Sequence, residues 1–198
     1  MLLKDVLILD SSMDAAQACD LIVSGTTVDS ILPPRSADMP EEIDGKGSIA
    51  VLPGFVNAHG HAAMTLLRGL GEEAPLMEWL QKRIWPVEAR LRPEHVFWGT
   101  QLALLEMLSG GITCFADMYF FMDQAAEAAR LAGIRCALSR GLVGSDEKKL
   151  EEGVDLVRRY HDPSGLIRVQ LGPHAIYTVP PEAFSEISKT AKDLGVGI

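Results

Sequence analysis

From residue 50 onward the sequence alternates short apolar runs with segments whose apolar residues recur at helical spacing. Alternation of this kind is typical of βα units that build a parallel sheet. Four such units can be read, and residues 196–198 begin a fifth strand. A closed (β/α)₈ barrel requires eight units and about 250 residues. We therefore expect an α/β fold that forms the first half of such a barrel and cannot close it alone. The expected strands are residues 49–56, 112–116, 135–142 and 166–179, the last with its exit loop, and the expected helices are 75–91, 93–109, 122–132, 145–160 and 181–194.

Several residues mark where these helices should begin and end. Pro86 is expected to end or kink the first helix, since proline cannot donate the hydrogen bond that the preceding turn needs. Ser145 is a candidate N-terminal cap for the helix that follows it. Gly133 and Gly195 suit the left-handed conformation that commonly terminates helices. These signals define segments of ordinary helical length.

The first 50 residues have a different pattern. Residues 5–10 and 20–32 are rich in Val, Ile, Leu and Thr and predict short strands, and Gly25 divides the second run into a hairpin. Residues 33–48 contain three prolines and an acidic pair and are expected to form a loop. We therefore expect two parts, residues 1–50 as strands of a small β domain and residues 51–198 as the incomplete barrel.

Composition narrows the classes of function. A chain of 198 residues with 47% hydrophobic residues can bury a sizeable core. Its net charge of -9 disfavours binding to nucleic acid or to an anionic membrane surface, which leaves a small molecule as the expected partner. No apolar run approaches the roughly 18 residues of a membrane span, and the N-terminal residues do not resemble a signal peptide. Three cysteines without CxxC spacing suggest reduced thiols and a cytoplasmic location.

Two histidines, His59 and His61, alternate directly after the apolar run at residues 49–56. The period of two places both on one face at the end of a strand. Imidazole nitrogen is a preferred zinc ligand, and a catalytic zinc ion uses about three protein ligands and an open position. The two residues could supply two of these ligands. An isolated HxH can also be no more than two polar residues at a strand end.

The sequence around these histidines resembles the metal-binding motif of amidohydrolases, and within them the 5-methylthioadenosine/S-adenosylhomocysteine deaminase group. The resemblance is carried by VLPGFVNAHGHAAMTLLRG at 51–69, by WL at 79–80 with IWPVE at 84–88, and by GGITCFADMY at 110–119. It implies a TIM-type barrel, preceded by strands of a small β-sandwich that family members build from both ends of the chain.

The resemblance also implies a metal site that this chain supplies in part. His59 and His61 would bind one Zn²⁺ ion, with iron as the alternative ion. Asn57 stands where the two-metal relatives have an aspartate, which favours the one-metal branch. In relatives a third histidine and the acid–base glutamate follow the fifth barrel strand, and a metal-binding aspartate follows the eighth. We therefore expect no catalytic acid–base residue within the chain, because these positions would lie beyond Ile198.

Three further residues match substrate-binding positions of the deaminase group. Glu88 would accept hydrogen bonds from ribose hydroxyls, although a solvated helix-end carboxylate is the alternative. Arg140 would bind the amino-acid carboxylate of S-adenosylhomocysteine, because guanidinium suits bidentate recognition, or would instead pair with a nearby acid. His174, after the fourth strand, would bind a purine ring nitrogen, or would be a histidine of the core.

For four other residues we expect roles outside direct metal or substrate binding. His95 and His161 fall outside strand ends and are expected to be solvated. Asp117 is expected to support the structure rather than to bind metal. Trp85 is expected to pack the first helical segment, although it could border the substrate.

The function implied is zinc-dependent hydrolytic deamination of adenosine-type nucleosides by a complete enzyme: S-adenosylhomocysteine, 5′-methylthioadenosine or adenosine. A guanine, cytosine or chlorotriazine hydrolase is the alternative within the family. A noncatalytic binding or assembly module is the alternative of a different class. Because half a barrel exposes strand edges and apolar surface, we also expect a homo-oligomer.

Overall fold

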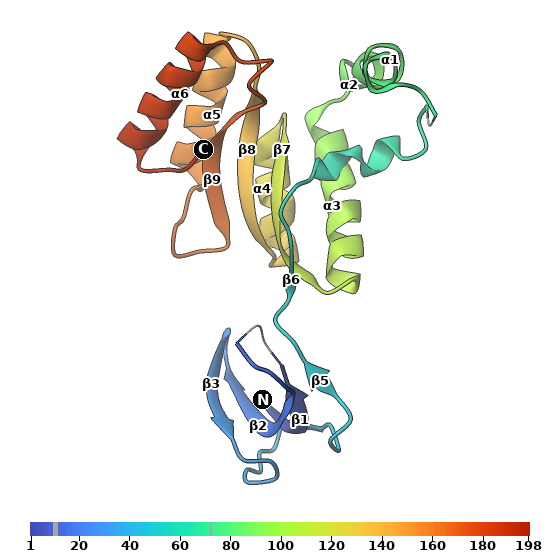
Figure 1. Ribbon diagram of the computed structural model, residues 1–198, viewed down its shortest axis with the longest axis vertical. Helices are drawn as coiled ribbons and strands as arrows, with labels where there is room; N and C mark the ends of the chain where they lie inside the picture. Colours follow the sequence, from blue (N-terminus) through green and yellow to red (C-terminus); the bar gives the residue numbers. More distant parts are fainter. Residues whose placement is uncertain (10–11, 72) are drawn as a thin grey trace. The chain divides into compact units, whose positions relative to one another are not determined.

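The computed structural model describes residues 1–9, 12–71 and 73–198. It divides into two compact units, Met1–Gly54 and Phe55–Ile198, which Figure 1 colours from blue to cyan and from cyan to red. The division falls after Gly54 rather than after residue 50. The reason is that β5 (Ala50–Val51) pairs in parallel with β1 (Leu2–Ile8) and therefore belongs to the first unit.

The first unit is a five-stranded mixed sheet with the order β3-β2-β1-β4, in which β5 also pairs with β1. Its other strands are β2 (Gln17–Ser24), β3 (Thr27–Leu32) and β4 (Glu42–Asp44). The predicted hairpin is present as the antiparallel pair β2 and β3, with Gly25 at a φ of +60° in its turn. The prediction of a loop throughout residues 33–48 is wrong, because β4 pairs in parallel with β1. The expected strand at 5–10 begins earlier, at Leu2, and its residue 10 lies outside the described residues.

A buried carboxylate organises the chain that leaves β3. Asp20 has 0% of its surface exposed. It accepts hydrogen bonds from four backbone N–H groups, those of Asp5 at 2.8 Å, Arg35 at 2.9 Å, Ser36 at 2.8 Å and Ala37 at 3.0 Å. A buried carboxylate is tolerated when its oxygens are satisfied in this way. The residues after β3 are therefore held by a side chain of β2.

The second unit contains a parallel four-stranded sheet whose order, β6-β7-β8-β9, is the order of the chain. The strands are β6 (Phe55–Asn57), β7 (Ile112–Tyr119), β8 (Arg135–Leu142) and β9 (Ile167–Pro173). This arrangement confirms the α/β class. Residues 196–198 are not assigned to a strand, but the carbonyl oxygen of Gly197 accepts a hydrogen bond of 3.1 Å from Leu171 N on β9.

Helices connect and cover these strands. They are η1 (Ala62–Leu67), α1 (Leu76–Trp79), η2 (Leu80–Ile84), α2 (Trp85–Glu88), α3 (Pro93–Ser109), α4 (Met122–Ala132), α5 (Glu147–Tyr160) and α6 (Pro181–Leu194). The predicted bounds of α4 and α6 are confirmed. The N-terminal cap of α5 is Asp146 rather than Ser145, because the Asp146 carboxylate accepts a hydrogen bond of 3.3 Å from Lys149 N.

Pro86 does not end the first helical segment. The chain continues from α1 through a π-helical turn, η2, into α2, where Pro86 occupies the first turn. A π turn is wider than an α turn and accommodates a proline ring that cannot donate to the preceding carbonyl. Glu88 is the last residue of the continued helix.

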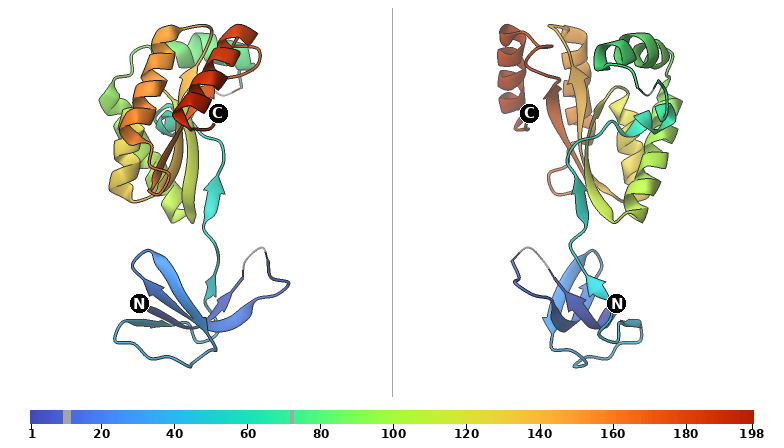
Figure 2. Two further views of the ribbon diagram at one scale, coloured as in Figure 1. Left: turned by 90° about the vertical axis from the view of Figure 1, so that its left-hand side faces the viewer. Right: turned by 45° about the vertical axis from the view of Figure 1, so that its right-hand side comes forward.

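Helices pack on one face of the parallel sheet (Figures 1 and 2), with α4 on β8, α5 on β8 and β9, and α6 on β9. Phe115, Leu138 and Val169 point into this layer and are almost fully buried. Each such side chain contributes about 1.5–3 kcal/mol of burial free energy. The alternate residues Ala116, Ala137 and Gln170 face away from it. Within the described residues no helix is long and apolar enough to cross a lipid bilayer.

Candidate functional site

The paired histidines lie just beyond the carboxyl end of β6. Asn57 Oδ1 accepts a hydrogen bond of 3.3 Å from His59 N, and the ring centroids of His59 and His61 are 5.3 Å apart. His61 Nδ1 lies 2.7 Å from the carbonyl oxygen of Met118 on β7. Because a carbonyl oxygen can only accept, Nδ1 carries a proton, and the neutral form of the ring then has its lone pair on Nε2. A hydrogen bond of this kind orients an imidazole for metal binding.

The chain after His61 is fixed by two contacts. Ala62 N donates to Asp117 Oδ1 at 3.0 Å, and Asp117 is 3% exposed. Burial raises the pKa of Asp117 to about 6, against the opposing effect of the Ala62 donor. On α3, the carbonyl oxygen of Gly99 accepts from Thr65 Oγ1 at 2.7 Å. A Cβ at Gly99 would lie 2.5 Å from the carbonyl oxygen of Ala63, so only glycine permits this close approach. The segment that carries His61 is therefore held by β7 and α3.

The histidines open onto the sheet face opposite the helices. They line a hollow of about 190 Å³ that also contains Asp117, Ser139 and Gln170. No group of three or more His, Cys, Asp or Glu side chains in the described part of the chain is placed to hold a metal ion. The two imidazoles thus fit a metal site only as part of its ligand set.

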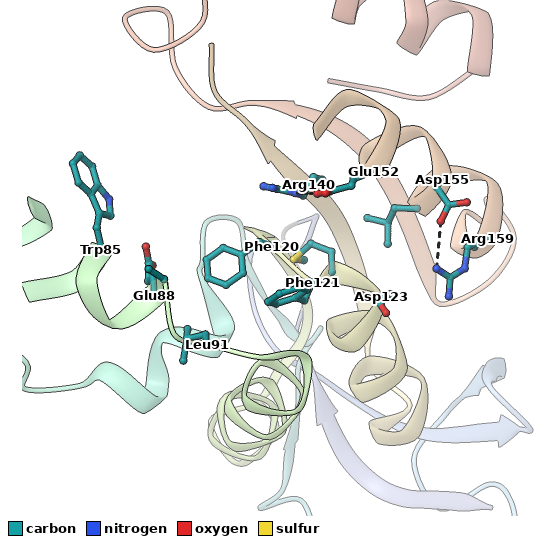
Figure 3. Close-up of a pocket in the computed structure, with 13 residues that line it drawn as sticks. Trp85, Glu88, Leu91, Phe120, Phe121, Asp123, Arg140, Glu152, Asp155 and Arg159 are labelled. Atoms are coloured by element: carbon teal, nitrogen blue, oxygen red, sulfur yellow. Dashed lines mark hydrogen bonds and ion pairs between the residues drawn. The ribbon is translucent and has the colours of Figure 1, made fainter. Parts of the chain in front are cut away.

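Glu88 and Arg140 line a second, larger cavity of about 640 Å³ in the same unit (Figure 3). Its walls come from α2, β8, α5 and the segment after β7. The cavity is lined by Trp85, Glu88, Ala89, Leu91, Phe120, Phe121, Met122, Asp123, Arg140, Glu152, Asp155, Leu156 and Arg159. Volumes of about 300–1,000 Å³ are typical of small-molecule sites.

Tyr119, at the end of β7, connects the two regions. Its hydroxyl donates to Glu88 Oε1 at 2.6 Å, and its ring stacks on Phe120 with centroids 4.1 Å apart. The centroid of the His61 ring is 6.3 Å from that of Tyr119. Burial, followed by the Glu88 carboxylate, raises the pKa of Tyr119, so its hydroxyl remains a donor. Tyr119 ends the motif at 110–119, and no local sequence pattern predicted its contact with Glu88.

Arg140 forms an ion pair within the larger cavity. Its Nε donates to Glu152 Oε2 at 2.8 Å, and its Nη1 donates to the carbonyl oxygen of Gly141 at 2.7 Å. Figure 3 shows Glu152 beside Arg140. Glu152 lies 12 residues further along the chain, on α5, and nothing in the local sequence pattern pointed to it.

His174 lies apart from these groups. It directly follows β9, is exposed, and its Nδ1 lies 3.0 Å from Thr178 Oγ1. Its backbone N–H donates to the carbonyl oxygen of Leu142 at 2.9 Å. The side chain is not among those that line either cavity, whereas its neighbour Pro173 lines the smaller one.

The remaining candidates have mainly structural contacts. His95 Nδ1 accepts a hydrogen bond of 3.0 Å from Arg92 N at the start of α3. The expectation that His161 is solvated is wrong, because it is half-buried and its Nδ1 accepts from Val169 N at 3.0 Å. Trp85 is 47% exposed and borders the larger cavity.

A parallel βα sheet with polar side chains gathered at the carboxyl ends of its strands is the arrangement of a βα-barrel enzyme. Residues 50–198 match the amidohydrolase family. The chain belongs to this family.

Curated relatives carry a more specific name. A protein of Syntrophomonas wolfei named 5-methylthioadenosine/S-adenosylhomocysteine deaminase is 48% identical over 160 residues, which are 79% of this chain and 37% of that protein. A protein of the same name from Carboxydothermus hydrogenoformans is 42% identical over 205 residues, covering 100% of this chain and 47% of that protein. The chain therefore spans less than half the length of these relatives.

Solved structures agree with the fold. An adenosine deaminase from Xanthomonas campestris with bound zinc superposes with a TM-score of 0.82 at 32% identity, covering 98% of this chain and 48% of that one. An atrazine chlorohydrolase from Arthrobacter aurescens complexed with zinc gives a TM-score of 0.83 at 23% identity, covering 98% of this chain and 51% of that one. At this lower identity the second likeness concerns the fold alone.

Proposed function

We propose that the complete protein containing this chain is a zinc-dependent hydrolytic deaminase of adenosine-type nucleosides: S-adenosylhomocysteine, 5′-methylthioadenosine or adenosine. The observation that carries the proposal is the position of Glu88 on the wall of the larger cavity, where it accepts a hydrogen bond from Tyr119. The ring centroid of Tyr119 lies 6.3 Å from that of His61. The names of relatives that are 42–48% identical support the same substrate class.

The proposed metal ligands in this chain are His59 and His61. The hydrogen bond from His61 Nδ1 to Met118 supports binding through Nε2. Zinc is favoured because the Xanthomonas deaminase contains it, and iron is the alternative. When bound, zinc supplies a hydrolytic nucleophile near neutral pH by acidifying water. The remaining ligands and the acid–base glutamate would come from residues outside 1–198.

The proposed substrate contacts follow from chemistry and position. Glu88 would accept hydrogen bonds from two vicinal ribose hydroxyls, as a carboxylate with Tyr119 on one oxygen keeps further lone pairs for this purpose. Arg140 lines the same cavity and would face the 5′ substituent. His174 would bind a ring nitrogen of the purine; this contact is proposed from the resemblance alone, since the side chain lines neither cavity.

The test is ammonia release by the complete protein, expressed from the full reading frame that contains this chain. We expect hydrolysis of at least one of the three adenosine-type nucleosides, and loss of activity in His61→Ala. If the protein hydrolyses guanine, cytosine or a chlorotriazine but none of the three adenosine-type nucleosides, the proposed substrate class is rejected and the assignment to the amidohydrolase family is unaffected. If the protein binds no zinc and hydrolyses none of these nucleosides, bases or triazines, a noncatalytic module is favoured.

Self-association of the chain and a cytoplasmic location are further proposals. The edge strand β6 carries Phe55 and Val56, which are 62% and 65% exposed. Exposed apolar side chains on an edge strand favour pairing with another chain. Light scattering coupled to size exclusion should give a mass above one chain, and a monomer would contradict the first proposal. The free thiols of Cys19, Cys114 and Cys136 support the second.

A further inference from the structure

The guanidinium of Arg140 is already engaged before any ligand enters the larger cavity. Its side chain is 16% exposed, and its Nε and Nη1 donate to Glu152 and to the Gly141 carbonyl. Glu152 is 46% exposed and reaches the pair from α5. The two side chains therefore present a neutral ion pair to the cavity rather than an available cation.

The other residues that line the larger cavity do not supply an unpaired positive charge. The second arginine, Arg159, is paired with Asp155 at 3.3 Å. The charged lining residues include four carboxylates and two guanidinium groups: Glu88, Asp123, Glu152, Asp155, Arg140 and Arg159. A cavity with this balance repels an entering anion and accepts a neutral or cationic group more readily.

We infer that Glu152 is a specificity-determining residue, which occupies Arg140 and makes the cavity favour nucleosides with a neutral 5′ substituent over those that carry an amino-acid carboxylate. This inference rests on the proposed function and narrows its substrate class. A carboxylate would have to displace Glu152 from Arg140 Nε or lie beside a second negative charge. A methylthio group makes no such demand, and the apolar wall formed by Phe120, Met122 and Leu156 suits it.

The test compares kcat/KM for 5′-methylthioadenosine and S-adenosylhomocysteine in the complete protein and in its Glu152→Gln variant. We expect the parent to prefer 5′-methylthioadenosine. The variant should shift the ratio about tenfold toward S-adenosylhomocysteine, mainly through KM, because it frees a charged donor for the carboxylate. The matched control is Glu151→Gln, one residue away on α5 and not among the residues that line the cavity, which should leave the ratio unchanged.

A measurement on the parent protein keeps the test independent of whether the variant folds. S-adenosylhomocysteine carries an ammonium group beside its carboxylate, so the measurement has to isolate the carboxylate. The methyl ester of S-adenosylhomocysteine, which keeps the ammonium group, should have a higher kcat/KM than S-adenosylhomocysteine itself in the parent protein. A ratio that stays constant in the variant, together with equal kcat/KM values for the ester and the acid in the parent, would overturn the inference while the proposed function stands. A ratio that moves toward 5′-methylthioadenosine in the variant would also overturn it, because Glu152 would then bind the substrate ammonium group. Ammonia release from adenosine alone would overturn the inference and retain the proposed function. Absence of ammonia release from all three nucleosides in the parent protein would instead reject the proposed function, and the inference with it.

Discussion

The substitution Asp20→Asn should destabilise the first unit severely. Asp20 Oδ1 accepts from the N–H groups of Asp5 and Arg35, and Oδ2 accepts from those of Ser36 and Ala37. An asparagine retains one carbonyl oxygen and turns an NH₂ group toward the other two donors. Each hydrogen bond to a charged group contributes about 1.5–3 kcal/mol, so the loss of two costs about 3–6 kcal/mol. That is a large part of the stability of an ordinary domain.

The assay can be confined to the first unit because Cys19 lies there and is buried. The rate at which a thiol reagent labels Cys19 in the native 198-residue chain reports local opening of this sheet. We expect labelling to accelerate by at least a hundredfold in Asp20→Asn, in line with about 3 kcal/mol. The exposed Asp14→Asn is the matched control. Equal labelling rates in Asp20→Asn and in the parent chain would refute the reasoning.

The same carboxylate predicts a dependence on pH. Burial opposes ionisation of Asp20, but the four backbone donors outweigh it and lower the pKa of this group below its usual value. A lowered folded-state pKa means that the stabilisation is present above the unfolded value, about 4, and is lost as the pH falls through the folded value. Cys19 labelling in the parent chain should therefore accelerate at acidic pH, after correction for thiolate content, and this acceleration should be smaller in Asp20→Asn.

Three further predictions concern the second unit. Tyr119→Phe should raise KM for the nucleoside about tenfold in the complete protein with a smaller effect on kcat, because Glu88 loses a charge-assisted donor; an unchanged KM would exclude this role for Tyr119. His59→Ala and His61→Ala should each lower the zinc content of the purified complete protein, measured by elemental analysis, and retention of stoichiometric zinc in both would remove them from the ligand set. Burial raises the pKa of Cys136 to about 12, so iodoacetamide at pH 8 should leave Cys136 unmodified in the native chain, as read by mass spectrometry of its peptides.

Much of the second unit could be predicted from its sequence, because residues near one another in the chain determine where its helices end and how its strands are ordered. The bounds of α4 and α6 were predicted because Gly133 and Gly195 adopt the left-handed conformation that ends both helices. The order of the strands was readable because βα units usually place consecutive strands side by side. Strand β4 was missed, since three residues that pair with the distant β1 carry too little pattern of their own.

The candidate site could be predicted only in part, because the contacts that define it join residues that are distant in the sequence. The HxH motif and Glu88 lie in segments whose local sequence is distinctive. The partners that decide their behaviour are remote: Tyr119 is 31 residues from Glu88, and Met118 is 57 residues from His61. Asp117 could be assigned a supporting role, but its contact with Ala62 spans 55 residues. Contacts of this separation follow from the packing of the sheet and helices, which no local pattern encodes.

The π turn at Leu80–Ile84 determines how the helical segment before Glu88 tolerates a change in its length. A π turn is in effect a one-residue insertion into an α-helix, and each residue of an α-helix turns the direction of the following side chains by about 100°. Deleting one residue from this turn would restore a regular α-helix and keep Glu88 directed toward Tyr119, whereas deleting a residue of the α-helical part while the turn is kept would rotate Glu88 away from it. In this chain the number of residues between the HxH motif and Glu88 therefore does not by itself fix the direction of the carboxylate, because the π turn can absorb one of them.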